Sequence, residues 1–138
     1  MNRTKPVVVF AFVLALSPAA FADGKPVKLI KQWSGSVNDA DLAKDAPEVI
    51  SDAKALAKLW KSWNLAGKSP EVDFDKELVV VTTTAGSKLN LIANLDDKGN
   101  LRVIGQATRD FGPGFRYVIA TISREGVKTV NGKELKSK

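Results

Sequence analysis

Stretches of alternating apolar and polar residues recur along the chain after residue 22 and predict a protein built mainly from β-strands. Residues 27–37 form the first such stretch, with Val27, Leu29 and Trp33 expected on one face of a strand. Residues 78–84 are a continuous run rich in Val and Thr, which is typical of a central strand covered on both faces. The pattern therefore predicts a sheet with a fully buried strand at its centre.

Further strands follow the central one. Alternation over residues 89–95 and 101–107 flanks a polar segment that contains Gly99, which predicts a hairpin. Residues 117–123 predict another strand, and residues 127–130 lead into the tight-turn dipeptide of Asn131 and Gly132. These hairpins favour a mainly antiparallel sheet.

One segment of this region has the spacing of an amphipathic helix. Its apolar stripe consists of Leu56, Leu59, Trp60 and Trp63. Ser51 fits the N-cap position and Gly67 the end of the helix, and we expect the two tryptophans to dock the helix onto the sheet. The predicted fold class is α+β, with one amphipathic helix packed on a mainly antiparallel β-sheet of about five to seven strands.

The first 22 residues have the three parts of a secretory signal peptide. A basic start with Arg3 and Lys5 precedes an apolar run over residues 7–16 and the small-residue cleavage pattern of Ala20 and Ala22. The apolar run is shorter than the about 20 residues of a membrane-spanning helix, so we expect no stable membrane insertion after cleavage. The prediction is a signal peptide over residues 1–22 and one domain over residues 23–138, periplasmic or secreted.

The composition excludes several kinds of catalytic and metal site. The chain has no His and no Cys, which removes Ser-His-Asp and Cys-His catalysis, thiolate metal sites and disulfides. The formal net charge is +6, but the lysines are spread singly along the chain, so nucleic-acid binding is not expected. We predict no catalytic residue, no metal in the binding site and no cofactor.

Two groups of carboxylates leave alternatives open. The segment with Asp39, Asp41 and Asp45 would be either a calcium-binding loop or a solvated surface loop, and it lacks the Gly and Glu of the EF-hand pattern. A small carboxylate-dependent hydrolase would need two acids facing each other across a cleft, roughly 5–9.5 Å apart in a glycosidase. The candidate acids are Asp73, Asp75 and Asp110.

A loop with aromatic residues and arginines is the strongest candidate for recognition. It surrounds a Gly-Pro-Gly turn at residues 112–114, and loops held by a rigid sheet often carry binding residues such as Arg. With the turn after the central strand, the predicted binding residues are Arg109, Phe111, Phe115, Arg116, Gly86, Ser87 and Lys88. The alternative is that Phe111 and Phe115 anchor the loop on the core, so their exposure decides between the two interpretations.

The order of elements over residues 51–130 resembles the C-terminal domain of PrcB, an accessory subunit of a bacterial protease complex. The shared features are a helix with Leu59 and Trp60, the sequence at residues 70–74, the strand at residues 78–81, a hairpin, a Pro-Gly loop and a last apolar strand. That family carries a Thr-Gly-Gly-Tyr type of turn after the central strand, of which this chain keeps Gly86. Residues 86–91 and 126–133 also resemble small secreted proteins of planctomycete-type bacteria. The resemblance implies a similar fold.

These observations favour a non-catalytic binding or accessory module that contacts another protein of the cell envelope. Two alternatives stay open: the carboxylate-dependent hydrolase, and a structural envelope component that associates with itself.

Overall fold

The structure, a computed structural model, describes residues 24–135, so the predicted signal peptide over residues 1–22 lies outside the described residues. The elements in chain order are β1 (Lys25–Pro26), β2 (Lys31–Val37), the 3-10 helix η2 (Ala40–Asp45), β3 (Val49–Ile50), α2 (Ala53–Ser62), β4 (Glu77–Thr84), β5 (Leu89–Leu95), β6 (Asn100–Ala107), β7 (Phe115–Ser123), β8 (Thr129–Val130) and β9 (Lys133–Glu134).

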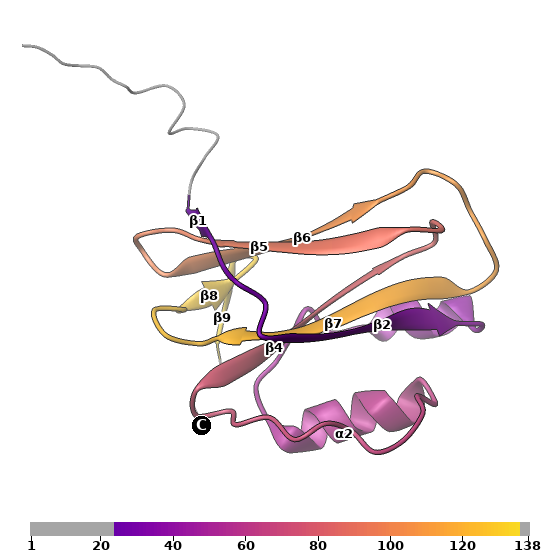
Figure 1. The fold of residues 1–138 in the computed structure, drawn as a ribbon, viewed down its shortest axis with the longest axis horizontal. Helices are drawn as coiled ribbons and strands as arrows, with labels where there is room; N and C mark the ends of the chain where they lie inside the picture. Colours follow the sequence, from indigo (N-terminus) through magenta and orange to yellow (C-terminus); the bar gives the residue numbers. More distant parts are fainter. Residues whose placement is uncertain (1–23, 136–138) are drawn as a thin grey trace, which may run out of the picture.

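The strands form two sheets, whereas the sequence pattern predicted one. The central sheet has the order β2-β7-β4-β3, and the hairpin sheet has the order β1-β5-β6-β8-β9. Among the described strand pairs, β6 with β8 is parallel and the others are antiparallel. Figure 1 shows α2 on one side of the central sheet and the hairpin sheet on the other. The mainly antiparallel α+β class is therefore confirmed, in a three-layer form.

Strand β4 is covered on both faces, as its β-branched sequence predicts. Val79 and Val81 belong to the apolar cluster on the helix side of the central sheet, and Leu78 and Val80 belong to the cluster between the two sheets. Successive side chains of a strand point to opposite faces, so both faces must be covered for all four to be buried. Each such side chain contributes about 1.5–3 kcal/mol when it is fully buried.

Helix α2 begins after Asp52, which replaces Ser51 as the N-cap. The Asp52 backbone is extended, with φ −147° and ψ 159°, and its side chain accepts a hydrogen bond of 2.7 Å from the N–H of Ala55. This bond satisfies one of the amides that the first turn leaves unpaired. The buried residues Leu56, Leu59 and Trp60 face the central sheet.

The helix ends at Ser62, earlier than the predicted end at Gly67. Trp63 is the C-cap, and its N–H still donates to the carbonyl of Leu59. Asn64 then adopts the left-handed conformation with φ 54°. Gly adopts this conformation most readily, and Asn is enriched in it among the other residues. The chain therefore turns at Asn64, and Gly67 lies in the segment beyond.

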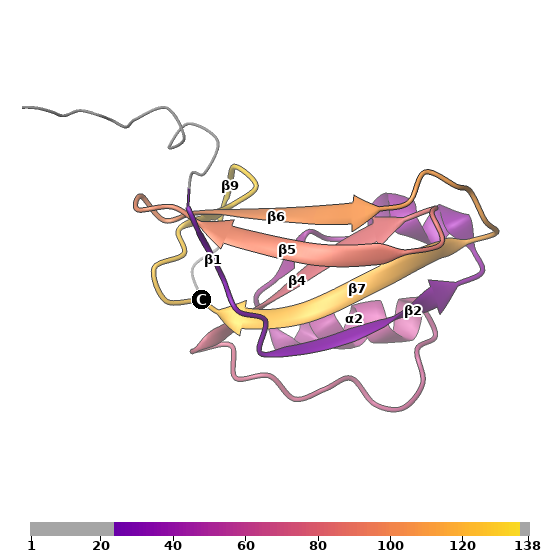
Figure 2. The same ribbon diagram turned by 45° about the horizontal axis from the view of Figure 1, so that its top comes forward.

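The first predicted strand, at residues 27–37, covers β2 and the segment that crosses from β1 in the hairpin sheet to β2 in the central sheet. Val27 and Leu29 pack against the cluster between the sheets, whereas Trp33 packs against the helix-side cluster. The prediction that these three residues share one face of a strand is therefore wrong. Figure 2 shows the crossing between β1 and β2 at one end of the molecule.

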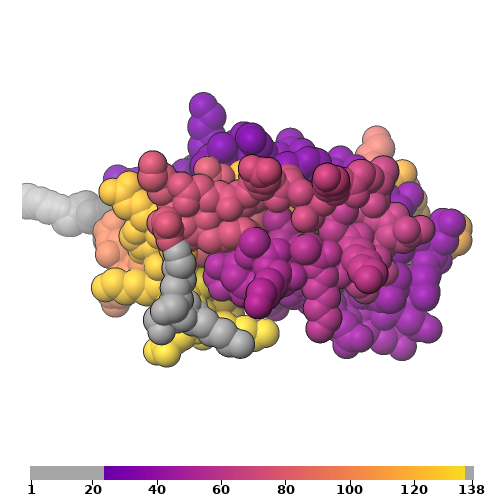
Figure 3. Space-filling model, turned by 90° about the horizontal axis from the view of Figure 1, so that it is seen from below, coloured from indigo at the N-terminus to yellow at the C-terminus, as the bar shows by residue number. Residues whose placement is uncertain are grey.

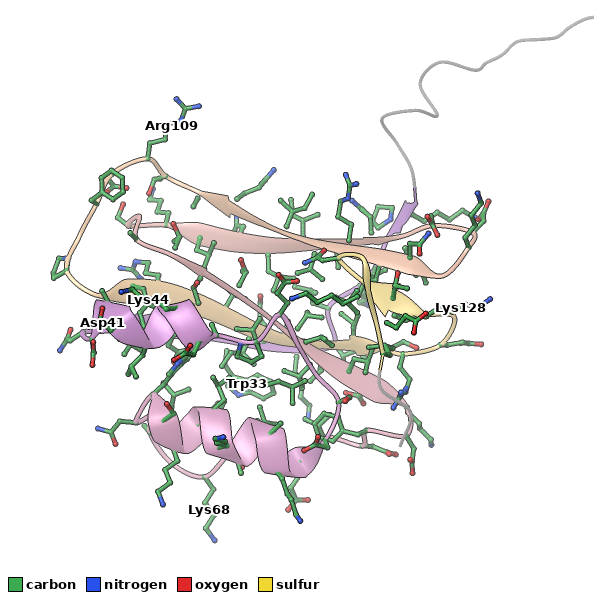
Figure 4. The ribbon with its side chains drawn as sticks, turned by 180° about the vertical axis from the view of Figure 1, so that it is seen from behind. Trp33, Asp41, Lys44, Lys68, Arg109 and Lys128 are labelled. Atoms are coloured by element: carbon green, nitrogen blue, oxygen red, sulfur yellow. The ribbon has the colours of Figure 1, made fainter. Side chains whose placement is uncertain are left out.

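The acidic segment predicted as a loop contains the short helix η2. Asp39 caps it by accepting a hydrogen bond of 3.0 Å from the N–H of Asp41. The Asp41 carboxylate also lies 3.3 Å from the ammonium of Lys44, and both residues are labelled in Figure 4.

Viewed from below, the side chains of α2 and of the segment that follows it cover one face of the molecule (Figure 3). Within residues 24–135, no helix combines the length and the apolar character needed to span a membrane.

Candidate functional site

Two segments that are far apart in the sequence are hydrogen-bonded to each other at one end of the sheets. They are the turn between β4 and β5, residues 85–88, and the loop between β6 and β7, residues 108–114 (Figure 1). The Thr108 hydroxyl oxygen accepts hydrogen bonds from the N–H of Ser87 at 2.9 Å and of Lys88 at 3.1 Å. The N–H of Gly112 donates to the carbonyl of Ala85 at 3.0 Å. The loop is therefore tied to the turn at both of its ends.

Asp110 completes this network. Its carboxylate accepts from the N–H of Ser87 at 3.0 Å and from the Thr108 hydroxyl. Hydrogen bonds from Ser87, then from Thr108, hold the pKa of Asp110 well below its ordinary value, because they stabilise the ionised form. Asp110 is therefore a charged anchor of the loop.

Glycine is required at two positions of the turn and the loop, because another backbone segment passes close to each. A Cβ atom on Gly86 would lie 2.3 Å from the Thr108 carbonyl oxygen. Gly114 has φ +70°, and a Cβ there would lie 1.9 Å from the carbonyl oxygen of Val37. Since the neighbouring atoms are backbone atoms, a side chain at either position would displace the loop.

The predicted aromatic pair is divided between surface and core. Phe111 is 88 % exposed at the loop tip, and Arg109 beside it points away from the body of the molecule (Figure 4). Phe115 is 4 % exposed and lies edge-on to Trp63, with ring centroids 5.0 Å apart. Including Phe115 in the binding surface was therefore wrong, because this ring is part of the helix-side core.

Arg116 remains exposed, on the opposite face of β7 from Phe115. It shares that face with Val118 and Ala120, which pack between the two sheets. Its side chain therefore lies on the face of the central sheet that is turned toward the hairpin sheet. Of the predicted binding residues, Ser87 and Lys88 are also exposed, whereas Gly86 is buried in the turn.

A hollow of about 570 Å³ opens between the two sheets at this end. We call it the side groove. Its lining includes Ser34 and Gly35 of β2, Lys88 of the turn, Leu89 of β5, Gln106 of β6 and Arg116 of β7. A second hollow, of about 300 Å³, shares Ser87 and Arg116 with it and extends beneath residues 112–113. The two hollows therefore meet at Arg116.

The sequence interpretation did not include Ser34, Gly35 or Gln106 in this site. Their contribution depends on the separation of the strands into two sheets, with β2 at the edge of one and β6 inside the other. The alternating pattern of residues 27–37 gives no signal of this separation, because it is equally compatible with one continuous strand.

The structure separates the acids that the hydrolase alternative would pair. Asp73 and Asp75 lie in the turn before β4, where the Asp73 carboxylate accepts from the N–H of Asp75 at 3.1 Å. Asp110 is bonded to the turn after β4. The eight residues of β4 span roughly 26 Å at about 3.3 Å per residue. Asp110 therefore does not face either of the other two across a cleft.

The residues that the structure describes contain no group of three His, Cys, Asp or Glu side chains placed to hold a metal ion. Asp39 and Asp41 of the acidic segment instead cap η2 and contact Lys44.

No protein-family model, curated protein or solved structure matches this chain. The resemblance to the C-terminal domain of PrcB stays a prediction, and a function can be inferred from the geometry of the loop and the side groove.

Proposed function

We propose that this protein is a non-catalytic binding module that is exported to the cell envelope and contacts another protein there. The contact surface consists of the loop tip with Arg109 and Phe111 and of the adjacent side groove with Arg116. A role outside the cytoplasm rests on the predicted signal peptide at residues 1–22.

The exposure of Phe111 on an anchored loop is the observation that carries this proposal. A ring that is 88 % exposed contributes almost no burial energy to the fold. The loop that presents it is nevertheless tied down by the network of Ser87, Thr108 and Asp110. Aromatic and Arg side chains are enriched at protein interfaces, and loops held by a rigid sheet often carry binding residues.

Affinity capture from the native envelope fraction tests the proposal. The bait is the chain without residues 1–22, which retains every described residue. We expect one polypeptide to be recovered with the wild type and to be lost with Arg109→Ala/Phe111→Ala, a double change confined to exposed side chains. Lys68→Gln is the matched control, because Lys68 lies on the helix side, away from Arg109 (Figure 4).

Recovery that is equal for the wild type and the double variant would place the contact elsewhere and contradict the proposed surface. Recovery of a second copy of this chain alone would contradict the binding role and favour a structural envelope component.

A further inference from the structure

One edge of β5 is left without a neighbouring strand over half of its length. Strand β1 pairs with β5 at Leu95 and Asn94, and the N–H of Val27 donates to the carbonyl of Ala93 at 2.8 Å. The chain then leaves the hairpin sheet, and β2 pairs with β7 instead. Within residues 24–135, no strand continues β1 along the first residues of β5.

The free backbone groups of this edge can be assigned from the alternation of the strand. Ala93 directs its carbonyl toward β1, whereas the carbonyl of Lys88 accepts from Thr108 on the β6 side. Successive residues of an antiparallel strand direct their N–H and C=O groups to opposite edges, so every second residue addresses the same edge. Leu89 and Leu91 share the edge of Ala93. Their N–H and C=O groups therefore point to the part of this edge that β1 does not cover.

The side groove lies beside this free edge. Leu89 lines it on one side, and Ser34 and Gly35 of β2 line it on the other. Unpaired strand edges are templates for another polypeptide chain, since each exposed N–H and C=O can form a sheet hydrogen bond.

The charges in the side groove are positive. Arg116 and Lys88 line it, and its lining within the described chain contains no Asp or Glu. Within the described residues, Asp41 and Lys44 form an ion pair, whereas Arg116 forms none. A guanidinium without a carboxylate partner favours an acidic ligand, because its planar donors match two carboxylate oxygens.

We propose that the side groove binds an extended acidic segment of the partner protein as an added strand on β5. The segment pairs with the backbone of Leu89 and Leu91 in line with β1, and one of its Asp or Glu side chains contacts Arg116. This inference rests on the proposed function, since it specifies how the partner is held.

The first test selects ligands from a library of twelve-residue peptides, displayed internally so that no peptide has a free C-terminus. The target is the folded chain without residues 1–22. We expect the selected peptides to share alternating apolar residues and one Asp or Glu.

The charge contact is tested by changing either of its two partners. Changing the acid of the peptide to its amide, or Arg116→Gln in the protein, should each weaken binding by tenfold or more. The two changes together should weaken it no further, because they remove the same contact. Lys68→Gln should bind as the wild type does.

Amide hydrogen exchange followed by NMR then locates the added strand. We expect the bound peptide to protect the amides of Leu89 and Leu91, whereas Asn90, whose N–H faces β6, should be unchanged. Protection along β2 instead would overturn the assignment to β5. Selected peptides that lack an acid, or that bind Arg116→Gln equally well, would overturn the charge contact.

If the library yields no binding peptide, the added-strand proposal is wrong. Capture of a partner through Arg109 and Phe111 would still support the binding module, so the two proposals fail separately.

Discussion

Phe111 and Phe115 lie four positions apart and have opposite environments. Phe111 stands at the tip of the loop, whereas Phe115 packs against Trp63 and also lies in the cluster that contains Tyr117. Strand β7 begins at Phe115, so the alternation of its side chains fixes Phe115 on the buried helix side and Arg116 on the other. Phe111 precedes the strand and is not bound by that alternation.

The two phenylalanines form a matched pair for a stability measurement. Phe115→Ala should lower the free energy of unfolding by about 3–5 kcal/mol, because it opens a cavity in the helix-side core. Phe111→Ala should change it by less than about 0.5 kcal/mol, as is usual for exposed positions. Urea denaturation followed by tryptophan fluorescence measures both, and equal losses would contradict the assignment.

The anchoring role of Asp110 predicts a pH dependence. Its folded pKa is lowered from 3.8, so its contribution to stability is present above the unfolded pKa and is lost as the pH falls below about 4 toward the folded pKa. The wild type should therefore melt at a higher temperature than Asp110→Asn at pH 7, and this difference should shrink steadily below about pH 4.

Thermal unfolding of both proteins between pH 7 and pH 2 checks this expectation. Asp97→Asn, a change at an exposed position of the hairpin turn, is the control. A difference between wild type and Asp110→Asn that stays constant over the whole range would show that the ionised carboxylate is not the anchor.

Helix α2 is fixed to the central sheet by one apolar stripe, and its ends are set by local backbone chemistry. The stripe was correctly predicted because helical periodicity depends on residue type alone. The ends were not, because Ser51, Asp52 and Asn64 are each compatible with a capping role. In the structure, the extended backbone of Asp52 makes it the N-cap, and the positive φ of Asn64 turns the chain after the helix.

The choice of N-cap can be measured directly. Asp52→Ala should destabilise the protein by about 1 kcal/mol, since it removes the acceptor for the N–H of Ala55. Ser51→Ala should have little effect. Chemical denaturation measures the free energy of unfolding of the two variants. A larger decrease for Ser51→Ala than for Asp52→Ala would show that Ser51 is the N-cap, as the sequence predicted.

The three layers of the molecule share two strands. Strands β4 and β7 contribute side chains to the helix-side cluster and to the cluster between the sheets. All three tryptophans belong to the helix-side cluster or pack against it. Because neither cluster can open without disturbing β4 and β7, we expect the layers to unfold together.

Leu91→Ala tests this cooperativity from the hairpin sheet. Leu91 is buried between the sheets, so its truncation should cost about 2–5 kcal/mol. The midpoint of tryptophan fluorescence should shift as far as the midpoint of far-UV circular dichroism, although no tryptophan lies in the hairpin sheet of the described chain. Separate midpoints would show that the hairpin sheet unfolds alone.

The sequence by itself determined the long strands from β4 to β7, the turn in the hairpin and the apolar stripe of the helix. The central strand at β4 and the positive φ of Gly99 and Asn131 follow from side-chain branching and local steric limits, which neighbouring residues set. The tertiary structure alone decided that β1 and β2 belong to different sheets, that Phe115 is buried, and that Ser34 and Arg116 line one groove. These features depend on contacts between segments far apart in the chain, which hydrophobic periodicity does not encode.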